Sequence, residues 1–474
     1  MERTAQSQHR APARAASLII AASLILGTVA LTAGSSPASA SSAWTAPPST
    51  SLSLLSLDSV DMLSQNAGFA VGWKGSNWNG ATFATATAAV MSWNGQRWSS
   101  TSLPSIAGAN SSVLASVSGT GSNDVWTAGW ELLGSATSPT SQPLLLHWNG
   151  SSWKTVSVTV AGQARIYGVT TVAANNVWAV GLSATSPTAA PQPLILHWNG
   201  AKWTTGNIAS QAPGEFISLS MVGSTPYAAG EGKNNPLLER YSGGSWSTVT
   251  VPASAAPSGG VLVSLYPESS SSIWAAGNGS SGPFVLHWNG AKWAVTTPPT
   301  PAGLSGVVLT SIAGQGSQVW ASGYGASTAQ TYPTPTPSPS ATTPPAESGH
   351  TNYGIVETWN GTSWAATRLG SSLPNTALYS ISAGDGPLVV VGQTTNNNSQ
   401  LMAGVIQQGS TPAAAASLLV TLLIVLVIVL ALLALTALLL AMRRQAGQGP
   451  DELPPGGTAD TGGEATGTPA LPVS

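Results

Sequence analysis

An all-β fold, a seven-bladed β-propeller, is what the sequence predicts, and three observations predict it. The phrase Trp-Asn-Gly-x-x-Trp recurs along the chain, and successive copies, one of them degenerate, begin 43 to 71 residues apart. A second phrase, aromatic-x-x-Gly, recurs in its own register between them. The segments that join the predicted strands alternate between short and long. A period of this length in β-type sequence is typical of propeller blades, each of four antiparallel strands.

The first phrase predicts the hairpin between the third and fourth strands of a blade. Asn-Gly favours a type I′ turn, in which both central residues have positive φ. We expect the two tryptophans to pack between adjacent blades, where aromatic pairs add about 0.5–1.5 kcal/mol beyond the area that they bury. Five complete copies and one degenerate copy occur, at Trp93–Trp98, Trp148–Trp153, Trp198–Trp203, Trp288–Trp293, Trp359–Trp364 and Tyr241–Trp246.

The second phrase predicts the second strand of each blade. Its copies are Phe69–Gly72, Trp126–Gly129, Trp178–Gly181, Tyr227–Gly230, Trp274–Gly277, Trp320–Gly323 and, with valine in the aromatic place, Val389–Gly392. The sequence therefore predicts seven second strands but only six hairpins, so one blade has no hairpin of its own. The segment around Trp44 resembles a fourth strand without its hairpin. We expect this N-terminal strand to close the last blade, which removes two open sheet edges.

Most tryptophans thereby receive structural places in the repeat: Trp44, Trp93, Trp98, Trp126, Trp148, Trp153, Trp178, Trp198, Trp203, Trp246, Trp274, Trp288, Trp293, Trp320, Trp359 and Trp364. The remaining three, Trp73, Trp78 and Trp130, lie in or near the connections after second strands. Those connections and the ones after fourth strands are long and unequal, as in residues 130–142, and they belong to one face of the disc. Variable loops on a rigid scaffold are a usual place for a binding surface, so these three tryptophans are the candidate ligand-binding residues.

The N-terminal residues 1–40 have the composition of a secretory signal peptide. Arg3, Arg10 and Arg14 precede an apolar stretch, and the small residues Ala38-Ser39-Ala40 predict a cleavage site. An uncleaved membrane anchor is the alternative. The propeller is then expected over residues 41–410.

A transmembrane helix is predicted over residues 413–442. Its stretch Leu418–Met442 carries no charge and exceeds the roughly 20 residues that cross a bilayer. Arg443 and Arg444 follow, which places the short tail, residues 443–474, in the cytoplasm and the propeller outside. The tail has a disordered composition. These features predict a single-pass protein of the plasma membrane.

Composition limits the partners. The chain has no cysteine, so the ectodomain must be held together by its core. Charged residues make up 6% of the chain, the formal net charge is −2, and no basic run occurs outside the two ends. Nucleic-acid binding needs clustered lysine and arginine, so no nucleic-acid partner is expected.

Catalytic and metal motifs are missing from the sequence, so no catalytic residue, metal or cofactor is predicted. His147, His197 and His287 each precede the first tryptophan of the hairpin phrase in three different blades, too far apart to share a metal ion. Asp124 begins a second strand, where a turn-capping role suffices. No spacing singles out a catalytic pair among the carboxylates Asp58, Asp61, Glu131, Glu215, Glu231, Glu239, Glu268 and Asp385.

The segments Asp124–Gly129 and Leu146–Trp153, with their copies, resemble the seven-bladed β-propellers of bacterial secreted and surface proteins, loosely the kelch/galactose-oxidase-like group. The paired glycines of kelch blades are missing, and without cysteine the copper site of galactose oxidase cannot form. The resemblance implies the fold and a carbohydrate- or protein-binding role.

The predicted function is therefore a membrane-anchored extracellular binding or adhesion module for a protein or carbohydrate ligand. A glycan-acting ectoenzyme, a hydrolase or lyase, is the alternative, and a structural scaffold of an envelope complex is another. An acidic pair near the ring centre on the long-loop face would favour the enzyme. An exposed aromatic patch including Trp73, Trp78 or Trp130 would favour binding.

Overall fold

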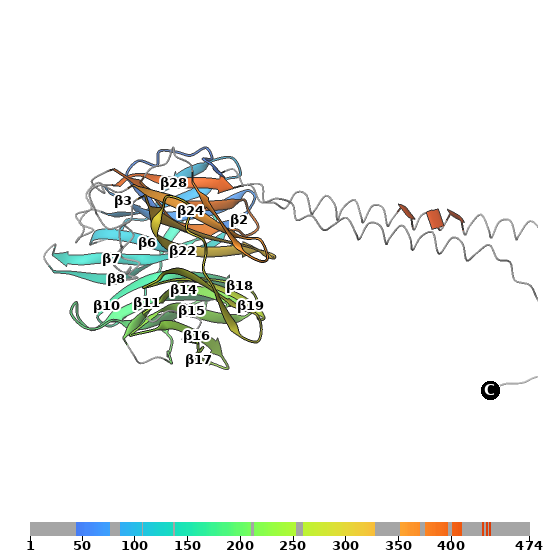
Figure 1. Ribbon diagram of the computed structural model, residues 1–474. Helices are drawn as coiled ribbons and strands as arrows, with labels where there is room; N and C mark the ends of the chain where they lie inside the picture. The colour runs from blue at the N-terminus through green and yellow to red at the C-terminus, as the bar shows by residue number, and fades with distance from the viewer. Residues whose placement is uncertain are drawn as a thin grey trace, which may run out of the picture. The chain divides into compact units, whose positions relative to one another are not determined.

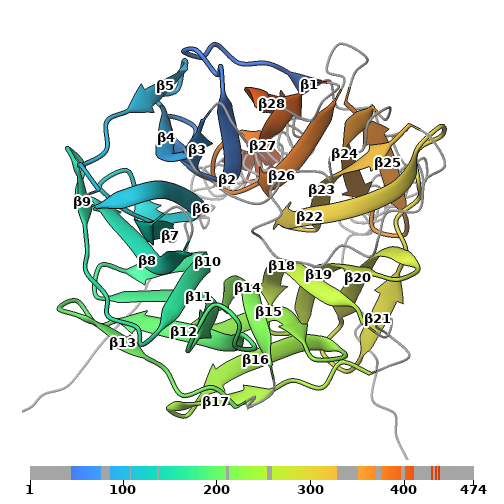
Figure 2. The ribbon, with the colours of Figure 1, turned by 90° about the vertical axis from the view of Figure 1, so that its left-hand side faces the viewer.

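The computed structural model describes residues 44–75, 86–106, 108–135, 138–209, 213–252, 259–327, 351–369, 375–396 and 401–409, and six helical residues between 429 and 437. Between Trp44 and Gly409, seven four-stranded antiparallel sheets are arranged around a central axis, which confirms the seven-bladed propeller (Figure 1, Figure 2). The predicted signal peptide lies outside the described residues, as do the cytoplasmic tail and nearly all of the transmembrane segment. No helix among the described residues has the length and apolarity to cross a membrane.

Each blade is a meander whose first strand lies nearest the axis (Figure 2). Blades one to four are β2 (Leu55–Ser64), β3 (Ala67–Lys74), β4 (Thr87–Trp93) and β5 (Trp98–Thr101); β6 (Ala109–Gly121), β7 (Asp124–Ser135), β8 (Ser138–Trp148) and β9 (Trp153–Thr155); β10 (Gln163–Ala173), β11 (Asn176–Ala184), β12 (Gln192–Trp198) and β13 (Trp203–Thr205); β14 (Gly214–Val222), β15 (Thr225–Gly232), β16 (Pro236–Ser242) and β17 (Ser245–Thr248). Blades five to seven are β18 (Val261–Ser269), β19 (Ser272–Gly279), β20 (Gly282–Trp288) and β21 (Trp293–Thr296); β22 (Ser305–Gln315), β23 (Gln318–Ala326), β24 (Asn352–Trp359) and β25 (Trp364–Arg368); β26 (Thr376–Ser382), β27 (Leu388–Thr395) and β28 (Leu401–Gly409) with β1 (Trp44–Thr45).

The seventh blade is closed by the N-terminal strand, as predicted. β1 pairs with β28, and Trp44 lies opposite Gly409. Gly409 takes the place that Trp148 has in blade two, opposite Trp153. Trp44 packs against the cluster that contains Trp320 and Val390, so the strand joins the last blade to the sixth.

Aromatic packing between neighbouring blades forms the core. At four junctions the second-strand aromatic ring of one blade meets the fourth-strand tryptophan of the next blade edge to face. Ring centroids are 5.7 Å apart for Phe69 and Trp153 and 5.4 Å apart for Trp126 and Trp203, with interplanar angles of 88° and 84°. The prediction that the tryptophan pairs pack between blades is confirmed, and each pair also stabilises its own hairpin.

The hairpin loops differ from the prediction. Trp148 pairs directly with Trp153, and of the four residues between them only Gly150 has positive φ, at 92°. The type I′ prediction is therefore wrong. Oδ1 of Asn149 accepts hydrogen bonds from the amides of Ser151 (3.1 Å) and Ser152 (3.0 Å), so the asparagine side chain stabilises the turn that was expected from backbone conformation alone.

A β-bulge occurs at the same place in the first strand of every blade. It lies opposite the glycine of the aromatic-x-x-Gly phrase, where two backbones approach closely. A Cβ atom on these glycines would lie between 1.9 and 2.6 Å from a carbonyl oxygen of the first strand. The phrase therefore marks a position where no side chain fits.

Serines that follow the bulge join the first strands of neighbouring blades. The hydroxyl oxygens of Ser59, Ser116, Ser218, Ser264 and Ser380 accept hydrogen bonds of 3.1 to 3.3 Å from the amides of Val117, Val169, Leu265, Ile312 and Val60, each in the next blade. The first strand is the inner edge of each sheet, and these bonds give partners to amides on that edge.

Candidate functional site

The face that carries the connections after second and fourth strands, called here the long-loop face, differs from the prediction in one respect. Residues 130–142 were expected to be a loop. Instead β7 and β8 remain paired out to Ser135 and Ser138, which makes this a long hairpin of 12- and 11-residue strands. Its tip projects at the left of Figure 1.

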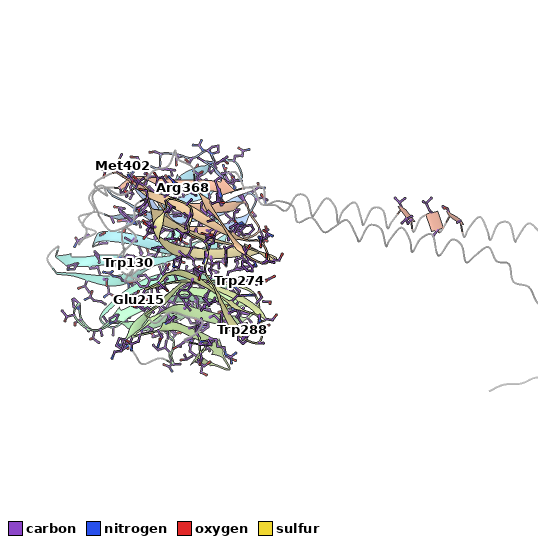
Figure 3. All side chains as sticks on the ribbon, viewed as in Figure 1. Trp130, Glu215, Trp274, Trp288, Arg368 and Met402 are labelled. Atoms are coloured by element: carbon purple, nitrogen blue, oxygen red, sulfur yellow. The ribbon has the colours of Figure 1, made fainter. Side chains whose placement is uncertain are left out.

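Charged and aromatic side chains from blades two, three and four gather near this face. Trp130 comes from β7, Arg165 and Tyr167 from β10, Glu215 from β14 and Glu231 from β15. In Figure 3, Trp130 and Glu215 lie toward the long-loop side, whereas Trp274 and Trp288 lie toward the opposite side. We call Arg165, Glu215 and Glu231 the charged cluster.

Equivalent positions in the repeat place Arg165 beside Glu215. Each lies two residues before the bulge of its first strand, and the first strands of adjacent blades pack together. The other five blades have uncharged residues there, Ser56, Val113, Val261, Val308 and Ala377. Glu231 enters the cluster from the second strand, because it pairs directly with Glu215.

Aromatic rings hold the arginine. Cζ of Arg165 lies 5.5 Å from the ring centroid of Trp130, a cation–π arrangement. Trp130 in turn meets Tyr167 edge to face at 5.8 Å. The guanidinium is therefore positioned by an indole that is itself fixed in the core.

The electrostatics of the cluster are unusual because its charges are not paired. Glu215 is 7% exposed. Its pKa is raised to about 8, chiefly by burial and also by the nearby Glu231, while Arg165 acts in the lowering direction. Burial also raises the pKa of Glu231. Within the described part of the chain no lysine or arginine is in ion-pair contact with a carboxylate, so Arg165 has no such contact with Glu215 or Glu231.

The two predicted ligand-binding tryptophans that the structure describes lie in the core. Trp73 and Trp130 are 3% and 1% exposed and pack in one apolar cluster with Val113, Tyr167 and Leu401. They form part of the core beneath the long-loop face and present no open aromatic platform. Trp78 lies outside the described residues. A ligand-binding role for the three residues stays a prediction.

The three histidines are held within their own blades. His147, His197 and His287 stack on the second-strand tryptophans at centroid distances of 4.6, 4.0 and 3.8 Å. Nε2 of each contacts the first residue of the second strand: Asp124 at 2.8 Å, Asn176 at 2.9 Å and Ser272 at 3.1 Å. Asp124 also accepts a hydrogen bond from Thr120, near the end of β6, so it both links the two sides of the turn and orients the histidine.

Sequence reasoning missed the charged cluster as a unit. Its signal was present, because Arg165 and Glu215 precede the bulge by the same distance, and Glu231 directly follows the glycine of its second-strand phrase. The bulge itself could not be seen in the sequence. The first strands that carry Arg165 and Glu215 could therefore not be aligned with one another.

The chain is similar to several solved structures, one of them described as a β-propeller. The chain is similar to YCF48 bound to D1 peptide (15% identity, 80% of this chain and 100% of that chain, TM-score 0.46). It is also similar to the WD40 β-propeller domain of Doa1 (10% identity, 79% and 98%, TM-score 0.45) and to Aleuria aurantia lectin in complex with α-methyl-L-fucoside (14% identity, 63% and 96%, TM-score 0.37). No family model and no curated protein sequence matches the chain.

Proposed function

We propose that the chain is a membrane-anchored extracellular binding or adhesion module of a bacterium, and that it binds a protein or carbohydrate ligand on the long-loop face. The anchoring, the plasma-membrane location and the outward orientation rest on the composition of residues 1–40, 413–442 and 443–474. The loose kelch-like resemblance adds to the expectation of a binding role.

One observation carries the choice of face. Arg165, Glu215 and Glu231 come together from adjacent blades without ion-pair contact between opposite charges. Burying ionisable groups that are left unpaired costs folding free energy. Groups of this kind, with pKa values shifted by burial, cluster at functional sites because a ligand can supply the missing partner.

The test is a screen of the purified chain against a glycan array and a pull-down from the native envelope. A specific ligand should be lost in Arg165→Gln and Glu231→Gln, and retained in Arg97→Gln, whose exposed side chain lies in the hairpin loop between β4 and β5. Trp73→Ala, Trp78→Ala and Trp130→Ala test the predicted tryptophans, with thermal unfolding as the check that each variant is folded. No ligand from either screen, with folded protein, would contradict a binding module and leave the scaffold alternative.

A second candidate, a glycan-acting hydrolase or lyase, is favoured by the Glu215–Glu231 pair. Directly opposed residues on antiparallel strands have Cβ atoms about 4.5–5.5 Å apart. Retaining glycosidases hold their two carboxyl groups about 5–5.5 Å apart, one of them with a raised pKa. If this is the function, a glycan bound on the array is cleaved on incubation, and Glu215→Gln stops cleavage while binding persists.

A further inference from the structure

We infer that the charged cluster binds the basic side chain of a polypeptide, a lysine or arginine whose cationic group lies between the carboxyls of Glu215 and Glu231, while Arg165 donates hydrogen bonds to an acceptor on the same ligand. The inference rests on the proposed function, because it names the class of ligand for that face. It favours a protein over a carbohydrate.

The first step of the argument is the like-charged pair. Glu215 and Glu231 are direct cross-strand partners on β14 and β15, so their side chains leave the same face of the sheet. Like charges directly opposite one another destabilise a sheet. A cation between the two carboxyls converts that repulsion into two attractions.

The second step is the missing partner. Glu215 is nine-tenths buried, and its carboxyl is acted on by burial and by the charges of Glu231 and Arg165, with no hydrogen bond from a described residue among the causes. Arg165 is the nearby cation, yet it lies over Trp130 and makes no ion pair with either glutamate. The arginine is thus kept available for a ligand atom, and both carboxyls are left for a second cation.

The third step is the balance of charge. Above the pKa of Glu215, where both carboxyls are ionised, the cluster has one positive and two negative groups. A single cationic ligand group neutralises it, whereas an anionic ligand would add a second excess negative charge. A peptide supplies a cation and, in its backbone carbonyls, the acceptors that a guanidinium binds.

Binding should be linked to proton release. The charged groups that act on Glu215 are Glu231 on β15 and Arg165 on β10. On β18, which packs against β14, the carboxylate is Glu268, seven residues beyond the equivalent position Val261. With a pKa of about 8, Glu215 is mostly protonated at pH 7, and a cation beside it favours the ionised form. Affinity for the cation should therefore rise from pH 6 to pH 8.

The experiment uses the full-length chain and three capped tripeptides with glycine at both ends and lysine, norleucine or glutamate in the middle. Binding is followed by ligand-observed NMR at pH 6 and pH 8. We expect the lysine peptide to bind, more tightly at pH 8, and the norleucine and glutamate peptides to bind at least ten-fold more weakly. Glu215→Gln and Glu231→Gln should each weaken binding about ten-fold, and the matched control Glu268→Gln, at an exposed site, should leave it unchanged.

Equal binding of the lysine and norleucine peptides, or no binding of any peptide to folded protein, would overturn the inference. Lysine binding that survives both Glu215→Gln and Glu231→Gln would also overturn it, because attraction to the general surface would then suffice. The proposed function fails separately: a glycan or protein ligand that is lost in Arg165→Gln, with no lysine-peptide binding, would refute this inference and keep the binding module.

Discussion

Glu239 and Glu357 show how one residue in a neighbouring link decides whether a buried carboxyl has a hydrogen-bond donor. Both lie two residues before the last aromatic residue of the third strand, and both are fully buried. Oε2 of Glu239 accepts a hydrogen bond from the amide of Ala209, at 3.1 Å, in the link from the preceding blade. Ala209 lies six residues after Trp203, and the residue six after Trp293 is Pro299, which has no N–H.

Glu357 is consequently left without partners. Neither carboxyl oxygen has a hydrogen bond, and burial raises its pKa to about 8. The pKa of this carboxyl in the unfolded chain is near 4.5. Between pH 4.5 and about pH 8 the folded protein therefore keeps a proton on Glu357 that the unfolded chain has lost. The contribution of Glu357 to stability is therefore greatest below pH 4.5 and is lost as the pH rises toward 8.

Glu357→Leu should stabilise the protein, since leucine occupies the equivalent position in blades two, three and five, at Leu146, Leu196 and Leu286. Removing an unsatisfied buried polar group gains about 1–3 kcal/mol. The gain should be larger at pH 9 than at pH 5, measured by thermal unfolding.

The matched control is Glu239→Leu. It leaves the amide of Ala209 without its acceptor, so we expect a loss of stability. Destabilisation by Glu357→Leu at both pH values would refute the explanation.

At the scale of the element, the bulge and the glycine opposite it set the shape of each blade. The seven bulges share one register, and the serine after the bulge bonds to the next blade in five of seven junctions. A local irregularity in one strand thereby becomes a connection between blades.

Gly129→Ala should destabilise by about 1–3 kcal/mol, the usual cost of overpacking, or more. The added Cβ would lie 1.9 Å from the carbonyl oxygen of Val113, and 2.8 Å from Cα of Leu114. Both are backbone atoms, which cannot rotate away. Chemical denaturation measures the loss. Gly121→Ala is the control, because no atom lies within 4 Å of the position that its added Cβ would take, and equal effects of the two changes would contradict the explanation.

At the scale of the whole molecule, closure of the ring depends on a two-residue strand. β1 completes the seventh sheet, and Trp44 packs between the last two blades. Without β1 the edge of β28 has unpaired backbone groups, which invite pairing with another chain.

Deleting residues 41–50 should therefore lower the unfolding temperature sharply and promote aggregation. Trp44→Ala should show a large part of the effect, up to about 3–5 kcal/mol, the range for large aromatic truncations. Thermal unfolding with light scattering measures both. Trp44→Phe should lose less, because most of the apolar contact is kept. An unchanged unfolding temperature in the deletion would show that closure does not stabilise the ring.

The sequence by itself determined the number of blades, the positions of the second strands and hairpins, and closure by the segment around Trp44. These follow from repeated local spacing, which needs no knowledge of distant contacts. It did not determine the loop conformation around Asn149, because there a side chain replaces a backbone hydrogen bond.

Only the tertiary structure decided what surrounds Arg165, Glu215 and Glu231. Arg165 lies 50 residues before Glu215 in the chain, and their proximity depends on how adjacent blades pack and on a bulge that the sequence does not reveal. The same holds for Trp73 and Trp130. Their place beside variable connections made them candidate ligand-binding residues, and the packing of neighbouring blades buries them.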